Sequence, residues 1–156
     1  MPGDERAQDL TFMRMALEEA AKASDVGEVP IAALIVQDSQ VLAKAHNYRE
    51  LWQDPTAHAE IIAIRAAAAA LGTWRLTGTT LYVTVEPCAM CIGAIILARV
   101  SRVVFGAWDP KGGACGSVLD LTHEPRLNHH VEIVSGLLEE ESQTLLQQFF
   151  RRLRTG

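Results

Sequence analysis

The strongest constraint on the fold of this chain is a pair of cysteines, Cys88 and Cys91, that directly follows Pro87. Residues three apart on a helix share one face, so both sulfur atoms can reach one metal ion without straining the backbone. Proline is favoured at the start of a helix, where the N–H that it lacks would have no partner. We therefore expect both thiols in a first helical turn, where the helix dipole favours the thiolate that a metal binds.

Length and composition predict one globular domain over residues 1–156, with 49% hydrophobic and 21% charged residues. The net charge of −5 argues against a protein that coats nucleic acid, but it allows a local basic cleft. We expect a cytoplasmic protein without signal peptide or membrane contact, because no apolar run reaches the roughly 18 residues that span a bilayer. Three cysteines in a reducing compartment favour metal binding or catalysis over a disulfide.

Strand and helix patterns alternate after an initial hairpin. The expected strands are residues 31–36, 41–46, 79–85, 102–106 and 131–134, the first two joined by the turn 38–40. The expected helices are residues 9–24, 57–71, 87–98 and 137–154, with a further short helix at 117–121. This alternation predicts an α/β fold with three α/β/α layers around a central five-stranded mixed sheet.

The partner of the two cysteines is expected at the start of the helix 57–71. Helices that follow strands begin at the same edge of an α/β sheet, which brings His58 towards Cys88 and Cys91. These three side chains can hold one Zn²⁺ and leave a fourth position for water, as catalytic zinc sites do. A structural zinc site would instead need a fourth protein ligand, for which the chain offers Cys115, His46, His123, His129 and His130.

Glu60, two residues after His58, is the predicted proton carrier. Residues two apart on a helix point away from each other, so both serve one site only where the helix is met end-on at its first turn. A carboxylate that lies beside a zinc-bound water without binding the metal can move protons. Zn²⁺ with two thiolates and a neutral imidazole sums to zero charge, so such water benefits from a nearby base. A structural zinc site would have no use for Glu60.

The segments 58–60 and 87–91 match H-x-E followed by P-C-x-x-C, the established signature of the zinc nucleobase deaminases. The resemblance covers nearly the whole chain. The segments 54–61, 79–88, 102–107 and 128–133, together with 28–30 and 149–151, resemble bacterial tRNA adenosine deaminases of the TadA type.

This resemblance implies the fold of the cytidine deaminase superfamily and hydrolytic deamination of adenosine to inosine at the wobble position of a tRNA anticodon. It implies that His58, Cys88 and Cys91 hold one zinc per subunit. Zinc hydroxide then attacks C6 of the flipped-out adenine, while Glu60 transfers protons and ammonia leaves. It also implies a homodimer and an anticodon stem-loop of arginine tRNA as the partner.

Three further residues are substrate contacts by the same resemblance. Asn47 can both donate to and accept from a base edge, although the residues alone favour an ordinary loop-capping asparagine. Asp109 suits a sugar hydroxyl and Lys111 suits a phosphate. Trp108 stands where the family more often has a basic residue, and it either stacks on a base or packs in the protein.

Two other functions stay open. The first is a deaminase of free guanine, cytosine or a nucleoside, which shares the fold and the motif. The second is a non-catalytic, zinc-stabilised RNA-binding module, against which Glu60 argues. The arginines Arg151, Arg152 and Arg154 either complement the dipole of the last helix or contact RNA phosphates.

Overall fold

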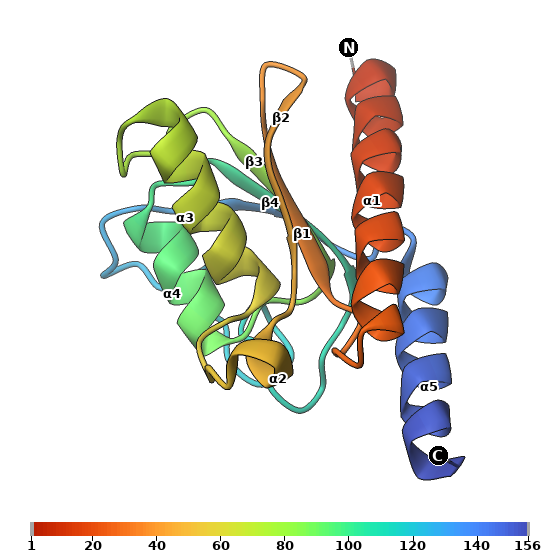
Figure 1. Cartoon of the computed structure of the whole chain (residues 1–156). Coiled ribbons are helices and arrows are strands. Elements are labelled where there is room, and N and C mark those ends of the chain that lie inside the picture. The colour runs from red at the N-terminus through yellow and green to blue at the C-terminus, as the bar shows by residue number, and fades with distance from the viewer. Residues whose placement is uncertain (1, 156) are drawn as a thin grey trace.

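The computed structural model describes residues 2–155 and shows a five-stranded mixed sheet between two layers of helices (Figure 1). The strands are β1 (Ala32–Gln37), β2 (Gln40–His46), β3 (Thr80–Val85), β4 (Arg102–Ala107) and β5 (Glu132–Val134). They lie in the order β2-β1-β3-β4-β5. The predicted three-layer α/β/α fold is confirmed. The single domain over residues 1–156 stays a prediction, and Met1 and Gly156 lie outside the described residues.

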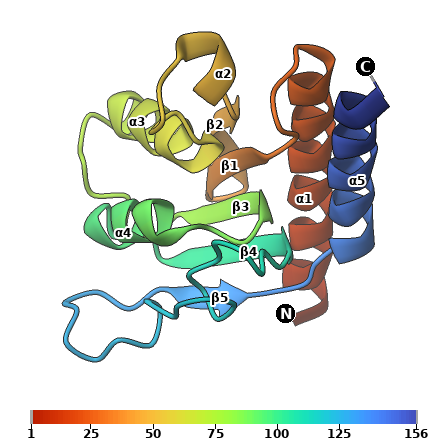
Figure 2. The same cartoon turned by 90° about the horizontal axis from the view of Figure 1, so that it is seen from below.

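The two helical layers cover opposite faces of the sheet (Figure 2). On one face lie α1 (Pro2–Asp25) and α5 (Glu139–Thr155), and on the other lie α3 (Ala59–Leu71) and α4 (Ala89–Leu97). A short helix, α2 (Arg49–Trp52), occupies the connection between β2 and α3. No helix within residues 2–155 combines the length and the apolar character that a bilayer crossing demands.

The central strands are buried on both faces, which explains why their sequences are apolar almost throughout. In β1, Leu34 faces the layer of α1 and α5, while Ile35 faces the layer of α3 and α4. In β3, Tyr82 and Leu81 divide between the two faces in the same way. The sheet therefore separates two apolar cores and holds the helices of both layers at fixed positions.

Strand directions determine where the loops meet. Strand β1 runs antiparallel to both β2 and β3, and β3 runs parallel to β4. Strands β2, β3 and β4 therefore all end at the same edge of the sheet. The chain leaves this edge towards α2 and α3, towards α4, and into the long loop 108–131.

Several expected boundaries need correction. Both α3 and α4 begin two residues later than expected, at Ala59 and Ala89, and α2 lies in a segment expected to be a loop. Residues 117–121 form an irregular segment and no helix. The reason is that their backbone N–H groups donate to residues before the segment, since Ser117 donates to the Glu86 side chain and Leu121 donates to Ala114 O.

Candidate active site

Three side chains of the types that bind metal ions meet near the starts of α3 and α4. The ligand atoms of His58, Cys88 and Cys91 all lie within 4.8 Å of one another. His58 Nδ1 is 3.6 Å from Cys88 Sγ and 3.4 Å from Cys91 Sγ. With Zn–S near ~2.3 Å and Zn–N near ~2.0 Å, a tetrahedral zinc ion separates such ligand atoms by ~3.5 Å. The donor set and its spacing therefore fit zinc.

The helix starts place these ligands. His58 is the N-cap of α3 (φ −75°, ψ 152°) and Cys88 is the N-cap of α4 (φ −78°, ψ 176°). Neither side chain forms an N-cap hydrogen bond, so the ring and the thiol can point past the helix ends towards each other. Cys91 lies in the first turn of α4 and is buried. The expectation that both thiols lie in a first turn is therefore wrong for Cys88, which precedes it.

The two thiols behave as one acid–base pair. A hydrogen bond from Cys91 lowers the pKa of Cys88 to about 4. The same contact, together with burial, raises the pKa of Cys91 far above its usual range. Cys88 is therefore the more readily ionised of the two thiols. A thiolate-binding cation such as Zn²⁺ replaces the protons of thiols when it binds.

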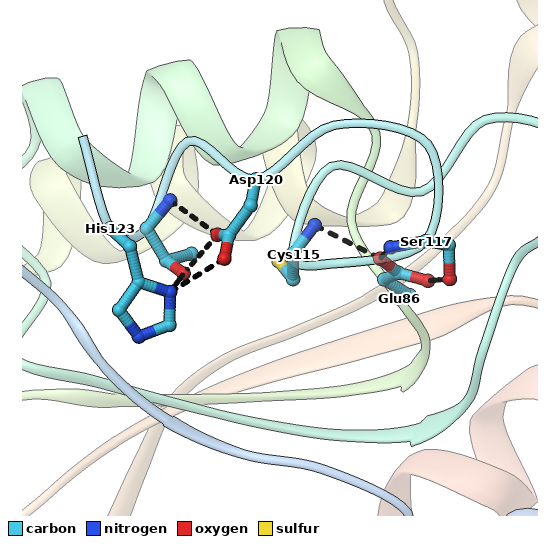
Figure 3. A network of polar contacts seen from close by, with 6 residues as sticks. Glu86, Cys115, Ser117, Asp120 and His123 are labelled. Carbon is cyan, nitrogen blue, oxygen red and sulfur yellow. Dashed lines mark hydrogen bonds and ion pairs between the residues drawn. The ribbon is translucent and has the colours of Figure 1, made fainter.

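Three of the five residues proposed as a fourth ligand have ring nitrogens in contact with other groups. His46 Nδ1 lies 2.8 Å from Asn47 O, and His129 Nε2 lies 2.6 Å from Val100 O. His123 Nδ1 lies 2.6 Å from Asp120 Oδ2 (Figure 3). Across residues 2–155, no further His, Cys, Asp or Glu joins the group of three ligands. The arrangement resembles an open, catalytic metal site more than a closed, structural one.

Glu60 is buried beside the metal-binding group. It lies in the first turn of α3, is 4% exposed, and lines the same pocket as His58 and Cys88. Burial raises the pKa of Glu60 to about 7. A carboxyl group with this pKa can both accept and release a proton near neutral pH, which is the property of a general acid–base group.

The pocket has a volume of about 190 Å³. This is below the ~300–1,000 Å³ of pockets for drug-sized ligands and suits a small planar group such as one nucleobase. Besides the metal-binding end, its walls include Asn47 and Arg49 from the α2 segment and Asp109 from the loop after β4. The structure therefore brings Asn47 and Asp109 to the same pocket as Glu60.

The position of Asn47 is compatible with both interpretations made from the sequence, a loop-capping residue and a contact to the base. Its Oδ1 accepts the N–H of Arg49 (3.1 Å), so it does cap the start of α2. Its backbone N–H donates to Ile31 O (3.0 Å), which fixes Asn47 against the segment that enters β1. Within residues 2–155 the side-chain amide nitrogen has no protein acceptor, and it lies at the pocket wall.

Lys111 and Trp108 lie away from this pocket. Lys111 lines a separate groove with Phe150, Arg151 and Arg154 at the C-terminal end of α5. Trp108 packs edge-on against Phe105, with ring centroids 4.9 Å apart, and lines another groove. Trp108 is nevertheless 40% exposed, so packing in the protein and stacking on a base both stay predictions.

Two buried carboxylates near the pocket were not recognised in the sequence. Glu28 is fully buried and accepts the N–H groups of Glu50 (3.1 Å) and Leu51 (2.7 Å) at the start of α2. Glu86 is 3% exposed and accepts N–H groups of the loop after β4. Each acidic residue stands beside an apolar strand, a position where charged residues are rare, and this was the available signal.

Comparison with known proteins places the chain in a family. The family model of the MafB19-like deaminases matches residues 7–154. The chain is 55% identical over 147 residues to the tRNA-specific adenosine deaminase of Bacillus subtilis, covering 94% of this chain and 91% of that protein.

Solved structures show the same relationship. A structure from a study of A-to-I editing by tRNA:A34 deaminases at the wobble position of transfer RNA superimposes with a TM-score of 0.84 and 48% identity, covering 87% of this chain and 99% of that chain. A guanine deaminase from Nitrosomonas europaea is more distant, with a TM-score of 0.74 and 25% identity over 88% of this chain and 81% of that chain. Because the family model and the B. subtilis relative both span nearly the whole chain, this protein belongs to the MafB19-like deaminases and, among them, to the tRNA-specific adenosine deaminases.

Proposed function

We propose that this protein is a zinc-dependent enzyme that converts adenosine to inosine at wobble position 34 of a tRNA anticodon. The observation that carries the proposal is the placement of a buried Glu60 beside the group formed by His58, Cys88 and Cys91, in a pocket of base size. The names of the related proteins, which refer to tRNA-specific adenosine deaminases and to tRNA:A34 deaminases, support the choice of substrate.

The three ligands would hold one zinc ion per subunit. When bound, zinc supplies a Lewis acid that makes water a nucleophile near neutral pH. The protein contributes the geometry, because His58 and Cys88 project from two helix starts and Cys91 closes the buried side of the site.

Glu60 would carry the protons of the reaction. Its carboxylate takes a proton from the attacking water and delivers it to N1 of the adenine ring. It next transfers the second proton of that water to the leaving amine, so that adenosine and water give inosine and ammonia. A pKa near 7 lets the same carboxyl group perform both transfers.

Other residues would bind the RNA. The free amide nitrogen of Asn47 can donate to a ring nitrogen of the base, and Asp109 can accept from a ribose hydroxyl at the mouth of the pocket. Lys111, Arg151 and Arg154 form a basic groove beside the exposed Phe150, which suits phosphates and a stacked base of the anticodon stem-loop.

The decisive variant is Glu60→Gln, which keeps the size of the side chain and removes its acid–base function. We expect the variant to retain one zinc per subunit by elemental analysis and to lose at least about 10²-fold of its deamination rate on an arginine-tRNA anticodon stem-loop. Exposed Glu50→Gln, on α2, serves as the matched control with near-normal rate. Full activity of Glu60→Gln would show that the assigned proton carrier is wrong.

Guanine deamination is the second candidate, because the structure also resembles a guanine deaminase. The two are separated by comparing the anticodon stem-loop with free guanine, cytosine and adenosine under the same conditions. We expect inosine in the stem-loop and little product from the free compounds. Rapid turnover of free guanine, with an inert stem-loop, would favour the second candidate.

We also infer that the protein acts as a homodimer in the cytoplasm. The exposed apolar side chains Trp74 and Leu97 support the dimer. The three free cysteines within residues 2–155 support a reducing compartment.

A further inference from the structure

The side-chain carboxylate of Glu86 accepts several hydrogen bonds from one loop of the pocket. It follows β3 directly, and its side chain accepts the backbone N–H groups of Asp109 (2.9 Å), Cys115 (2.9 Å) and Ser117 (3.1 Å). The hydroxyl of Ser117 donates to it as well (Figure 3). All four hydrogen bonds come from residues 108–117, which we call the pocket loop, and both oxygens of the carboxylate are used.

The pocket loop also lies directly against the metal-binding segment. Gly113 forms an antiparallel bridge with Cys88, and Ala114 N donates to Pro87 O (2.9 Å). The backbone of Gly113 passes so close to Glu86 that a Cβ atom at this position would overlap the carboxylate. Only glycine allows this approach. Glu86 thus connects the strand that leads to Cys88 with the loop that returns over it.

Asp109 is the member of the pocket loop that reaches the pocket. Its backbone N–H is held by Glu86 Oε1, and its own Oδ1 accepts the N–H groups of Lys111 (3.0 Å) and Gly112 (3.2 Å). Asp109 and Glu86 both line the pocket that contains His58. The position of Asp109 relative to the metal-binding group is therefore set by one carboxylate two residues before Cys88.

We propose that Glu86 is a positioning residue that determines how tightly the RNA substrate binds, by holding Asp109 at the pocket mouth. The role deepens the proposed function and rests on it, because the ribose contact of Asp109 is part of that function. Glu86 transfers no proton and touches no reacting atom. Its loss should therefore weaken substrate binding more than it slows the chemical step.

The first test is Glu86→Gln, which keeps the shape but presents an NH₂ group to N–H donors. We expect KM for the anticodon stem-loop to rise about tenfold, the equivalent of one lost hydrogen bond, and kcat to stay within about twofold. Zinc content should stay at the wild-type level. Loss of zinc, or a fall in kcat with unchanged KM, would overturn the positioning role.

A double-mutant cycle tests whether Glu86 acts through Asp109. Asp109→Ala should raise KM in the wild-type background and should change it little when Glu86→Gln is already present. Fully additive effects of the two substitutions would show that Glu86 and Asp109 act independently, which contradicts the proposal. The variant Ser117→Ala, which removes a single hydroxyl donor, should raise KM about twofold to threefold and serves if Glu86→Gln folds poorly.

Amide hydrogen exchange gives a readout that needs no activity. The amides of Asp109, Cys115 and Ser117 should exchange faster in Glu86→Gln than in the wild type, while the amides of α4 keep their protection. Unchanged protection of these three amides would overturn the proposal. If exchange responds as expected but the wild-type protein does not act on the stem-loop, the proposed function fails and the anchoring of the pocket loop by Glu86 stands.

Discussion

The side chains of His58 and Cys88 are available to a metal because neither is used as a helix cap. N-cap positions usually carry Ser, Thr, Asp or Asn, whose side chains bond to N–H groups of the first turn. His58 and Cys88 forgo this bond, at a cost of about 1 kcal/mol in stability for each helix. At the scale of single residues, the two N-cap positions thus carry possible metal ligands, although a capping residue would stabilise each helix more.

A second group of residues, Asp9, Arg102 and Tyr82, stabilises the fold and has no part in the proposed reaction. The carboxylate of Asp9 is held by Arg102 at 2.8 and 2.6 Å and by the hydroxyl of Tyr82 at 2.7 Å. Burial would raise the pKa of Asp9, but the hydrogen bonds from Arg102 and Tyr82 together outweigh it and lower the pKa. A carboxyl group with a lowered pKa in the folded state stabilises the fold above its unfolded pKa and loses this effect as the pH falls through the folded pKa.

The prediction at this scale is that Asp9→Asn lowers the free energy of unfolding by about 2–3 kcal/mol at pH 7. The difference from the wild type should shrink as the pH falls below about 4. Urea unfolding of the wild type and of Asp9→Asn between pH 7 and pH 3 measures this difference in the free energy of unfolding. Asp25→Asn makes the same change at an exposed position of α1 and should have little effect. A difference that does not vary with pH would contradict the ionised pair.

At the scale of elements, α2 is stabilised by hydrogen bonds to side chains that lie outside the helix. It has only four residues, too few for a helical pattern in the sequence. Its first N–H groups are accepted by Asn47 and by the buried Glu28, which lies 22 residues before Glu50. The helix is therefore held by tertiary contacts, and these contacts also place Asn47 and Arg49 at the pocket.

We expect Glu28→Gln to lower the free energy of unfolding by about 2 kcal/mol, because one amide oxygen cannot replace the two acceptors of a carboxylate. The amides of Glu50 and Leu51 should exchange faster with solvent, as hydrogen-exchange NMR can detect. Glu50→Gln changes an exposed carboxylate on the same helix and should leave both quantities nearly unchanged. Unaltered exchange at Leu51 would mean that Glu28 does not hold α2.

The difference between local sequence patterns and tertiary contacts explains which parts of the structure could be predicted from the sequence. Long periodic segments, such as β1 and the part of α1 from residue 9 onwards, were predicted because local patterns determine them, whereas residues 2–8 of α1 were not predicted as helix. The meeting of His58 with Cys88 and Cys91 was predictable because all three stand at helix starts after strands. The turns at 117–121 and the separation of Lys111 from the pocket were not, because the path of the pocket loop depends on contacts with Glu86 that no local pattern records.

At the scale of the whole molecule, large apolar side chains are exposed near the ends of α3 and α4. Leu76 N, just beyond α3, donates to Ala98 O, just beyond α4 (2.7 Å), so the two helix ends lie close together. Near them Trp74 is 57% exposed and Leu97 is 71% exposed. Exposed apolar surface of this kind marks interfaces between proteins, and a second copy of the chain is the expected partner.

Sedimentation equilibrium should therefore find a species of twice the 17.0 kDa chain mass. Leu97→Lys should shift the equilibrium towards the monomer by at least about tenfold in Kd, since a charge is placed in an apolar contact. Leu153→Lys, at a 60% exposed position on α5, is the matched control and should leave Kd unchanged. A monomer at every concentration would count against the dimer.

The anchoring of residues 108–117 by one carboxylate has an evolutionary consequence. Asp109 and Ser117, near the two ends of this segment, are both held by Glu86, and residues 118–121 are hydrogen-bonded back to Gly113 and Ala114. Farther along the connection to β5, the hydrogen bonds of residues 124–128 lie within that stretch. Insertions, deletions and new side chains at residues 124–128 should therefore leave the group of His58, Cys88 and Cys91 in place. A lineage can vary this stretch while the residues around that group are inherited unchanged.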